Sequence, residues 1–217
     1  MNSRYWLLAG ATLARRRTTM AAAALFGLVI FYAVAWPMLS PYGADDVDFS
    51  LSRQGPSPRH PLGTDQFGRD LLTRLAAGGR TTFLIVAAAL AIIFVLGVVY
   101  GATSALGGRR VDMLMMRVLD GFFALPRLPI AIVILAALKL SAQNVQTVAF
   151  ALGVAGWMLT ARLVRGQLMS LKQQDYVRAA RAVGASWRAI ARRHLVPNSA
   201  GVLAVALLLE LPTMAIG

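Results

Sequence analysis

The run of residues 82–106 restricts the fold of this chain more than any other segment. Its 25 residues, TFLIVAAALAIIFVLGVVYGATSAL, include no charged side chain. A helix of about 20 apolar residues crosses the hydrocarbon core of a bilayer, which is about 30 Å thick. Four further apolar runs are predicted as membrane spans, at residues 18–39, 121–140, 145–161 and 200–217.

The composition supports a membrane protein. Hydrophobic residues make up 58% of the 217 residues and charged residues 14%, whereas roughly a quarter of the residues in soluble domains are charged. In lipid, helices satisfy their own backbone hydrogen bonds, and the period-2 alternation of a membrane barrel is not visible in the sequence. The predicted fold class is therefore an all-α integral membrane bundle.

The first span has an alternative interpretation as a cleavable signal peptide. Arginines at positions 15–17 precede an apolar run that includes Ala33, Val34 and Ala35, which is typical of a cleavage site. The run nevertheless continues to Leu39, and 17 residues precede it. We therefore interpret residues 1–17 as an N-terminal tail and residues 18–39 as a retained transmembrane helix.

The positive charges between the spans predict an orientation. With the N-terminus in the cytoplasm, segments 1–17, 107–120 and 162–199 face the cytoplasm and hold 15 Lys and Arg residues. Segment 40–81 and the turn near Lys139 face outside and hold six. Cytoplasmic loops carry the excess of Lys and Arg in membrane proteins. Residues 40–81 are therefore expected to form an extracytoplasmic loop, and residues 82–217 a transmembrane domain with a cytoplasmic loop at 162–199.

The last predicted span ends at Gly217 without a polar anchor behind it. Five spans that start in the cytoplasm would leave the C-terminus outside. We therefore expect a C-terminally truncated chain, in which a sixth helix is missing.

Two function classes find little support in the sequence. The net charge of +13 is divided into short blocks between apolar runs, whereas a nucleic-acid-binding protein gathers its basic residues on a soluble surface. There is no cysteine, and no H-E-x-x-H, G-x-S-x-G or P-loop motif. His60 and His194 fall in segments that are predicted on opposite sides of the membrane. We expect no enzymatic activity, no bound metal or cofactor, and no nucleic-acid partner.

The predicted cytoplasmic loop contains the segment DYVRAARAVGASWRAIARRHLVPN, residues 175–198. Asp175 is placed to cap or charge-stabilise the start of a helix that runs to Val183. Gly184 interrupts this helix, Ser186 is placed to cap a second one, and Pro197 ends it. The pattern indicates two short helices joined by a glycine bend. Such a hairpin either lies on the anionic lipid surface or docks onto a partner protein.

This segment resembles the "EAA" loop of ABC-importer permeases, in the form found in peptide and nickel permeases. The matching residues are Ala179, Ala180, Gly184, Leu195 and Pro197. Arg178 stands where the general motif has glutamate, and Val196 replaces the usual leucine. The resemblance implies that the hairpin is the coupling helix, which sits in a groove of a cytoplasmic ATPase. The residues that it assigns to ATPase coupling are Asp175, Tyr176, Ala179, Ala180, Gly184, Ala185, Ser186, His194, Leu195 and Pro197.

A second resemblance lies near the first span. The sequences HPLGTDQFGRDLLTRLAAGGRTTF, residues 60–83, and GLVIFYAVAWPMLSPYG, residues 27–43, are similar to the C-type permeases of dipeptide and oligopeptide systems. By its residues alone, the first of these contains a turn at 63–65, a helix cap at Thr64 or Asp65, and a short outer helix at 69–77. Together the two resemblances identify a C-type permease of the dipeptide, oligopeptide and nickel family.

This family implies a type I ABC-importer permease bundle of six helices, located in the bacterial inner or plasma membrane. Its expected partners are a homologous second permease, two ATPase subunits that hold ATP and Mg²⁺, an extracytoplasmic substrate-binding protein, and membrane lipid. The expected function is import of di- or oligopeptides. Import of nickel or glutathione by the same architecture is an alternative, as is a membrane scaffold with a lipid-binding basic loop.

Two further patterns concern the spans themselves. Gly97 and Gly101 form a GxxxG pattern, which permits close helix contact. Arg127 and Glu210 are the ionisable residues inside predicted spans, where charges are costly and usually face a cavity or a partner. We predict that Glu210 lies on the translocation path. Arg127 either lies on the path as well or extends its side chain to the membrane interface, and the sequence leaves open whether the two residues are paired.

Overall fold

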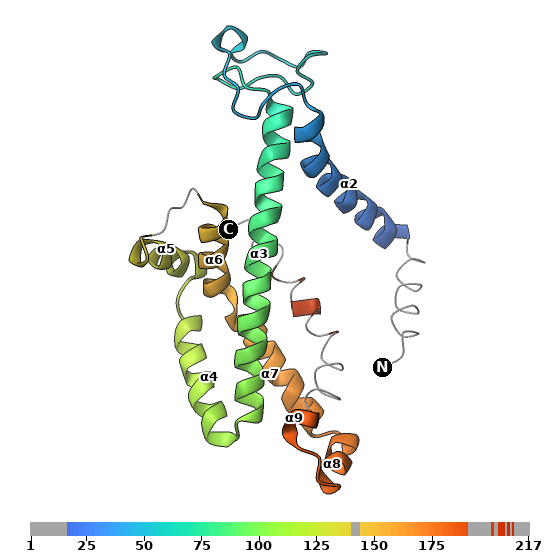
Figure 1. Ribbon diagram of the computed structural model, residues 1–217, viewed down its shortest axis with the longest axis vertical. Helices are drawn as coiled ribbons and strands as arrows, with labels where there is room; N and C mark the ends of the chain where they lie inside the picture. The colour runs from blue at the N-terminus through green and yellow to red at the C-terminus, as the bar shows by residue number, and fades with distance from the viewer. Residues whose placement is uncertain are drawn as a thin grey trace. The chain divides into compact units, whose positions relative to one another are not determined.

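The computed structural model describes residues 17–139, 144–190, 201, 204–206, 208 and 210, which are largely helical. The chain divides into two compact units, Met1–Leu84 and Ile85–Gly217, and each is described by itself. The elements are α2 (Arg17–Leu39), the 3₁₀ turn η1 (Phe49–Leu51), α3 (Leu71–Leu106), α4 (Arg109–Phe123), α5 (Arg127–Ala137), α6 (Val145–Gly156), α7 (Met158–Lys172), α8 (Asp175–Ala182) and α9 (Trp187–Ile190) (Figure 1). The all-helical fold class is confirmed over these residues.

Helix α2 matches the first predicted span and packs on the beginning of α3. Its Ala33 is buried, and a Cβ added at Gly79 of α3 would lie 3.2 Å from the Ala33 Cβ. The Tyr32 hydroxyl donates a hydrogen bond of 2.5 Å to the Leu72 carbonyl oxygen. Small residues therefore bring the two helices of this unit close together.

Helix α3 corrects the prediction of a short outer helix at 69–77 followed by a separate span at 82–106. It is one helix of 36 residues from Leu71 to Leu106, about 54 Å long at 1.5 Å per residue. Gly78 and Gly79 each weaken a helix by about 1 kcal/mol, but neither removes a backbone hydrogen bond as proline would. The predicted boundary at residues 81 and 82 therefore lies inside a continuous helix.

The predicted third span, 121–140, is divided between the end of α4 and α5. Residues 109–123 of the expected cytoplasmic loop and span form α4, and α5 follows at an angle of 93°. Pro126 causes this break, because it disfavours helical backbone in the preceding residue and supplies no N–H. Gly108, with φ of +86°, separates α4 from α3 by a backbone conformation that favours glycine.

The predicted fourth span, 145–161, is likewise divided. The Asn144 side chain caps α6 by accepting a hydrogen bond from the Gln146 N–H. Helix α7 follows at an angle of 45° and continues to Lys172, eleven residues into the predicted loop 162–199. Buried Val164 and Leu168 on α7 explain this extension, because they give the helix an apolar face to pack.

The described helices include two, α2 and α3, that are long and apolar enough to cross a membrane. The bent pairs α4–α5 and α6–α7 raise this number to as many as four, if each pair is counted as one span. The fifth predicted span lies mostly outside the described residues, and its described residues Gly201, Ala204–Ala206, Leu208 and Glu210 are helical.

The core of the second unit combines alanines with larger apolar side chains. Ala131 of α5 packs with Ala151 and Ala155 of α6, and Leu119 of α4 packs with Met158 and Ala161 of α7. The close contact expected at the GxxxG pattern is confirmed, because a Cβ added at Gly97 would lie 2.6 Å from the Thr160 Cγ2. Helices in membranes associate through such small residues.

Candidate functional site: the helical hairpin of residues 175–190

The first candidate site is the hairpin made by α8, α9 and the turn between them. Helix α8 begins at Asp175, which lies in its first turn, where a carboxylate is favoured by the helix dipole. The N-cap residue is Gln174, and its side chain makes no capping hydrogen bond. Of the two roles predicted for Asp175, charge stabilisation therefore fits the structure, while capping does not.

The end of α8 is a Schellman motif centred on Gly184. The Gly184 N–H donates to the Arg181 carbonyl oxygen, and the Ala185 N–H donates to the Ala180 carbonyl oxygen, both at 3.0 Å. Gly184 has φ of +86°, which L-residues rarely adopt. The predicted glycine bend is confirmed.

The second helix of the hairpin is capped as the sequence predicts. The Ala189 N–H donates a hydrogen bond of 3.3 Å to the Ser186 Oγ. Helix α9 runs from Trp187 to Ile190. His194, Leu195 and Pro197, which were also assigned to ATPase coupling, lie outside the described residues.

Two apolar residues hold the hairpin on the rest of its unit. The side chains of Val177 and Ile190 are each only 1% exposed. They pack in one cluster with Ala105 of α3 and with Val164 and Leu168 of α7. The hairpin is therefore seated on α3 and α7, as Figure 1 also shows for α7, α8 and α9.

The remaining surface of α8 is exposed and partly apolar. Tyr176, Ala179 and Val183 are exposed and follow the spacing of one helix face, and Val183 is 86% exposed. Ala180 and Ala185 are partly buried against the cluster that holds Val177 and Ile190, so they face the chain's own bundle rather than an open surface. Val183 was not predicted as part of this face. Its spacing from Tyr176 and Ala179, at positions i, i+3 and i+7 of a helix, could have indicated it.

A second candidate site is the ion pair between Arg127 and Glu210. The Arg127 Nη1 lies 2.9 Å from the Glu210 Oε2, and Glu210 is buried. A Cβ at Gly156 would overlap the Arg127 guanidinium, so the guanidinium lies against the break between α6 and α7. The structure therefore pairs Arg127 with Glu210, the two residues that the sequence proposed for the translocation path.

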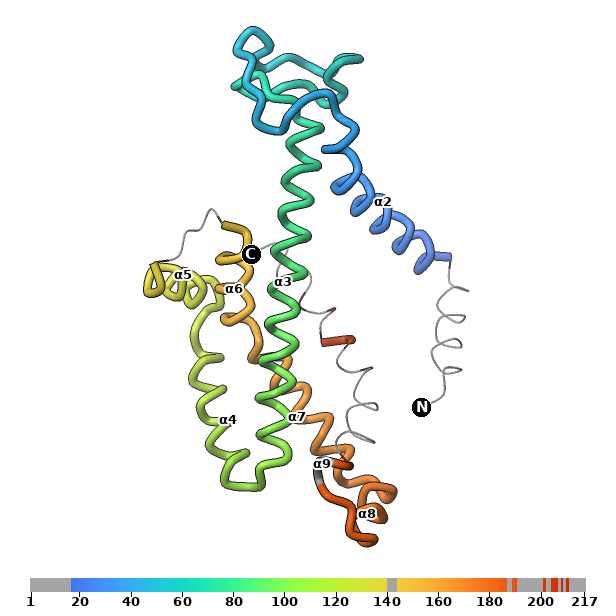
Figure 2. The backbone as a smooth tube through the Cα atoms, viewed as in Figure 1, coloured from blue at the N-terminus to red at the C-terminus, as the bar shows by residue number. Residues whose placement is uncertain are grey.

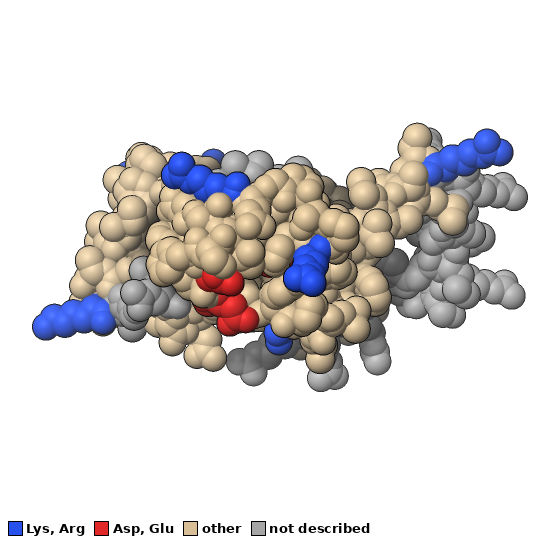
Figure 3. All heavy atoms as spheres, turned by 90° about the horizontal axis from the view of Figure 1, so that it is seen from above, with Lys and Arg blue, Asp and Glu red and all other residues tan. Residues whose placement is uncertain are grey.

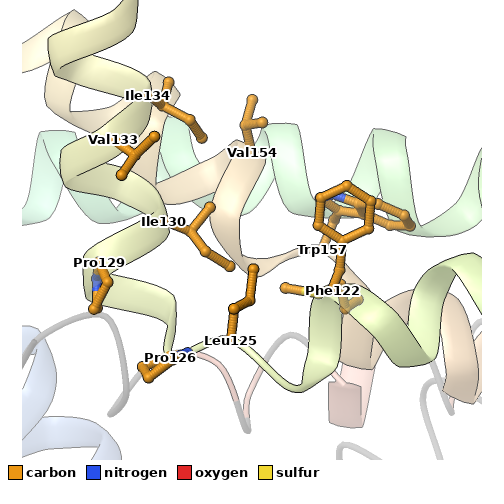
Figure 4. A pocket seen from close by; sticks show the side chains of 10 residues that line it. Phe122, Leu125, Pro126, Pro129, Ile130, Val133, Ile134, Val154 and Trp157 are labelled. Carbon is orange, nitrogen blue, oxygen red and sulfur yellow. The ribbon is translucent and has the colours of Figure 1, made fainter.

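An apolar pocket of about 520 Å³ lies in the bend between α4 and α5. Its lining residues are Phe122, Leu125, Pro126, Pro129, Ile130, Val133, Ile134, Val154, Trp157 and Met158. Figure 4 shows Ile130, Val133 and Ile134 on one side of this space, and Val154 and Trp157 on the other. Its chemistry suits an apolar group rather than an ion.

The loop of residues 40–70 is held by a polar network centred on Asp70. The Asp70 carboxylate accepts hydrogen bonds from the N–H and the hydroxyl of Thr73, both at 2.8 Å, and contacts the His60 Nδ1 at 3.0 Å. Burial alone would raise the pKa of Asp70, but the hydrogen bonds from Thr73 and His60 outweigh it, so the pKa lies below its ordinary value. Asp70, rather than Thr64 or Asp65, caps the helix that follows.

On the face that Figure 3 shows, acidic and basic side chains are not evenly mixed. In the space-filling view of Figure 3, acidic atoms gather in one small area, whereas the basic side chains stand apart from one another. Within the residues that the structure describes, no group of three His, Cys, Asp or Glu side chains is placed to hold a metal ion.

Comparisons with known proteins bear on this arrangement. Residues 93–217, more than half of the chain, match the family of binding-protein-dependent transport system inner membrane components. The chain is 35% identical over 200 residues to the oligopeptide transport system permease protein OppC of Haemophilus influenzae, and 36% identical over 201 residues to the dipeptide transport system permease protein DppC of Bacillus subtilis. It is 34% identical over 200 residues to OppC of Escherichia coli.

Each of these three matches covers 91% of this chain and between 61% and 65% of the relative. The resemblance to C-type dipeptide and oligopeptide permeases that residues 27–43, 60–83 and 175–198 indicated is confirmed. With its apolar helices, the chain is a multi-pass membrane protein. It belongs to the family of binding-protein-dependent transport system inner membrane components.

Proposed function

We propose that this chain is the membrane-spanning permease subunit of an ATP-driven ABC importer for di- and oligopeptides. The names of the relatives support this substrate class, because they are permease proteins of oligopeptide and dipeptide transport systems. ATP hydrolysis falls to partner subunits, which hold ATP and Mg²⁺, since this sequence contains no P-loop. The chain itself performs no covalent chemistry on its substrate.

The remaining partners follow from the same proposal. A homologous second permease completes the pathway, two ATPase subunits dock in the cytoplasm, and a substrate-binding protein docks on the extracytoplasmic side. The chain lies in the inner membrane of a bacterial cell. The loop of residues 40–70 faces the extracytoplasmic side, and the α8–α9 hairpin faces the cytoplasm. The distribution of Lys and Arg between the loops supports this orientation.

The geometry of the α8–α9 hairpin carries the proposal of coupling. Its inner side is anchored by Val177 and Ile190, while its outer side presents Tyr176, Ala179 and Val183. An element that is fixed to the bundle on one side and open to a partner on the other can transmit a partner's movement. We therefore assign the outer face to the ATPase and the inner face to the bundle.

The Arg127–Glu210 pair belongs to the transmembrane part of this mechanism. Removing one partner of a buried ion pair strongly destabilises the fold, because the remaining charge is left uncompensated. The pair joins the start of α5 to the last described helical segment, across the break at Gly156. We place it on the translocation path, where it fixes the relative position of these helices.

Two substitutions in the hairpin test the coupling role. Ala179→Glu puts a charge on the outer face, where the docked ATPase would bury it. A buried charge without a partner is costly. Gly184→Val forces a β-branched residue into a left-handed conformation, which costs L-residues about 1–2 kcal/mol even without branching. In proteoliposomes that contain the complete transporter, both variants should lose peptide uptake and substrate-stimulated ATP hydrolysis while the chain still inserts in the membrane.

Matched controls separate this effect from general damage. Gln173→Glu adds the same charge at the exposed turn before α8, and Gly184→Asn keeps a residue that tolerates left-handed backbone. A Cβ at Gly184 meets nothing within 4 Å, so only the backbone conformation distinguishes Val from Asn there. Both controls should transport at close to the wild-type rate. Wild-type transport by Ala179→Glu and Gly184→Val would refute the coupling role.

A further inference from the structure

A bidentate ion pair joins α4 to α7 close to the seat of the hairpin. The Arg165 Nε lies 2.5 Å from the Asp112 Oδ1, and the Arg165 Nη2 lies 2.6 Å from the Asp112 Oδ2. Arginine and carboxylate in this parallel arrangement have a fixed mutual orientation as well as a favourable energy. The pair therefore restricts both the distance and the angle between the two helices.

The same carboxylate is also connected to α3. The hydroxyl of Ser104, which is fully buried, donates a hydrogen bond of 2.6 Å to the Asp112 Oδ1. At the end of α7, the Lys172 Nζ donates a hydrogen bond of 2.7 Å to the Ala105 carbonyl oxygen of α3. Polar contacts thus connect α3, α4 and α7 at one place, where Figure 2 shows α4 and the C-terminal part of α3 side by side.

This junction adjoins the apolar seat of the hairpin. Ala105, which follows Ser104, packs in the cluster that holds Val177 of α8 and Ile190 of α9. Val164, which precedes Arg165, belongs to the same cluster. A displacement of the hairpin therefore acts on two residues that are direct chain neighbours of the polar junction.

A second ion pair between the same two helices provides a contrast. The Arg162 Nη2 of α7 lies 2.5 Å from the Asp120 Oδ1 of α4. Its two side chains are 45% and 62% exposed, whereas those of Arg165 and Asp112 are 30% and 16% exposed. Exposed ion pairs contribute little to stability, because water screens the charges and ordering the two long side chains costs conformational entropy. The Asp112–Arg165 pair is the one that is suited to hold the helices in register.

We propose that Asp112 and Arg165 are positioning residues, which transmit movement of the α8–α9 hairpin to α3 and α4. This inference rests on the proposed function of the hairpin and adds the route by which its movement reaches the membrane helices. The hairpin moves its seat on Ala105 and Val164, and the ion pair converts that movement into a joint movement of α3, α4 and α7. Without the pair, α4 follows the movement of α7 less closely, although the apolar contact of Leu119 with α7 and the exposed Arg162–Asp120 pair still join the two helices.

The test is the coupling between ATP hydrolysis and peptide uptake in the complete transporter, reconstituted in proteoliposomes. Asp112→Asn keeps the shape of the side chain and the Ser104 hydrogen bond but removes the charge that Arg165 requires. The number of peptides imported per ATP hydrolysed should fall about tenfold, since coupling between two sites typically amounts to 5- to 150-fold. The yield of assembled complex and its rate of ATP hydrolysis should stay close to those of wild type.

Two further variants sharpen the result. The exchanged pair, Asp112→Arg with Arg165→Asp, restores opposite charges, and the Ser104 oxygen can accept a hydrogen bond from the new arginine. It should recover most of the lost coupling. Asp120→Asn breaks the exposed pair between the same helices and should leave the ratio unchanged.

Each other outcome overturns the inference. An unchanged ratio in Asp112→Asn shows that the pair transmits nothing. Loss of assembly in both Asp112→Asn and the exchanged pair shows a purely structural role, as does an exchanged pair that assembles but stays uncoupled. If Ala179→Glu and Gly184→Val abolish transport while Asp112→Asn leaves the ratio unchanged, only this inference falls. If all three variants transport normally, the proposed coupling role of the hairpin falls with it.

Discussion

Glycines set the distance between helices wherever a side chain would meet a neighbouring backbone. A Cβ at Gly101 of α3 would overlap the Ala161 carbonyl oxygen of α7 and lie 2.9 Å from the Val164 Cβ. A backbone oxygen cannot rotate away as the end of a flexible side chain can. Gly166 of α7, by contrast, has nothing within 4 Å of an added Cβ. The two glycines therefore have different consequences although both lie inside helices.

The pair Gly101→Ala and Gly166→Ala tests this difference. Gly101→Ala should destabilise the chain by about 1–3 kcal/mol, because overpacking forces α3 and α7 apart. Gly166→Ala should be neutral or stabilising by up to about 1 kcal/mol, since alanine is the better helix former. Thermal unfolding of the purified chain in detergent measures both. Equal melting temperatures for the two variants would contradict the close contact at Gly101.

At the scale of the elements, local signals predicted some helix boundaries and missed others. Gly184 and Ser186 act through hydrogen bonds to backbone only a few residues away, so the hairpin turn could be predicted from the sequence. The continuity of α3 through Gly78 and Gly79 could not, because weak helix formers are tolerated where neighbouring packing compensates. The cap of α3 at Asp70 was missed although its hydrogen bonds to Thr73 are local, because the helix was predicted to begin at residue 69 and begins at Leu71.

The lowered pKa of Asp70 predicts how the loop of residues 40–70 responds to acid. A carboxyl group whose pKa is lowered by folding stabilises the fold above its ordinary pKa of 3.8, and this contribution is lost as the pH falls through the lowered value. Fluorescence anisotropy of a label on Gln54→Cys, in this chain without other cysteines, should therefore decrease as the pH falls below about 4.

Substitution at Asp70 should reduce that decrease. Asp70→Asn removes its share of the pH dependence, while Asp48 and Asp65, whose pKa values are also lowered by hydrogen bonds within the loop, keep theirs. The control is Asp45→Asn, at a carboxylate that is 95% exposed, which should follow the wild-type curve. The same curve for Asp70→Asn and wild type would show that Asp70 does not stabilise the loop.

At the scale of the whole molecule, the proposed orientation follows from loop charges rather than from any contact. The Lys and Arg excess in segments 1–17, 107–120 and 162–199 favours the cytoplasm for them. The corrected helix bounds do not alter this distribution, because a charge keeps its side of the membrane whether it lies on a loop or on the end of a helix. The loop of residues 40–70 and the α8–α9 hairpin are therefore expected on opposite sides.

Single cysteines test this orientation. Gln54→Cys lies in the loop of residues 40–70 and Ser170→Cys near the end of α7, and both positions are exposed. In spheroplasts, in which the outer face of the inner membrane is accessible, a membrane-impermeant thiol reagent should label only Gln54→Cys. After permeabilisation both should react. Labelling of Ser170→Cys before permeabilisation would reverse or abolish the proposed topology.

The sequence by itself determined the class of this protein, the glycine bend of the hairpin and the resemblance to peptide permeases. These properties depend on apolar runs, on local backbone hydrogen bonds and on short motifs, all of which are contiguous along the chain. Only the tertiary structure decided that Arg127 pairs with Glu210, 83 residues away, and that Asp112 pairs with Arg165, 53 residues away. It also decided that α4–α5 and α6–α7 are bent pairs. The physical reason is that an ion pair or a helix break depends on which distant side chains the fold brings together, and one-dimensional spacing does not carry that information.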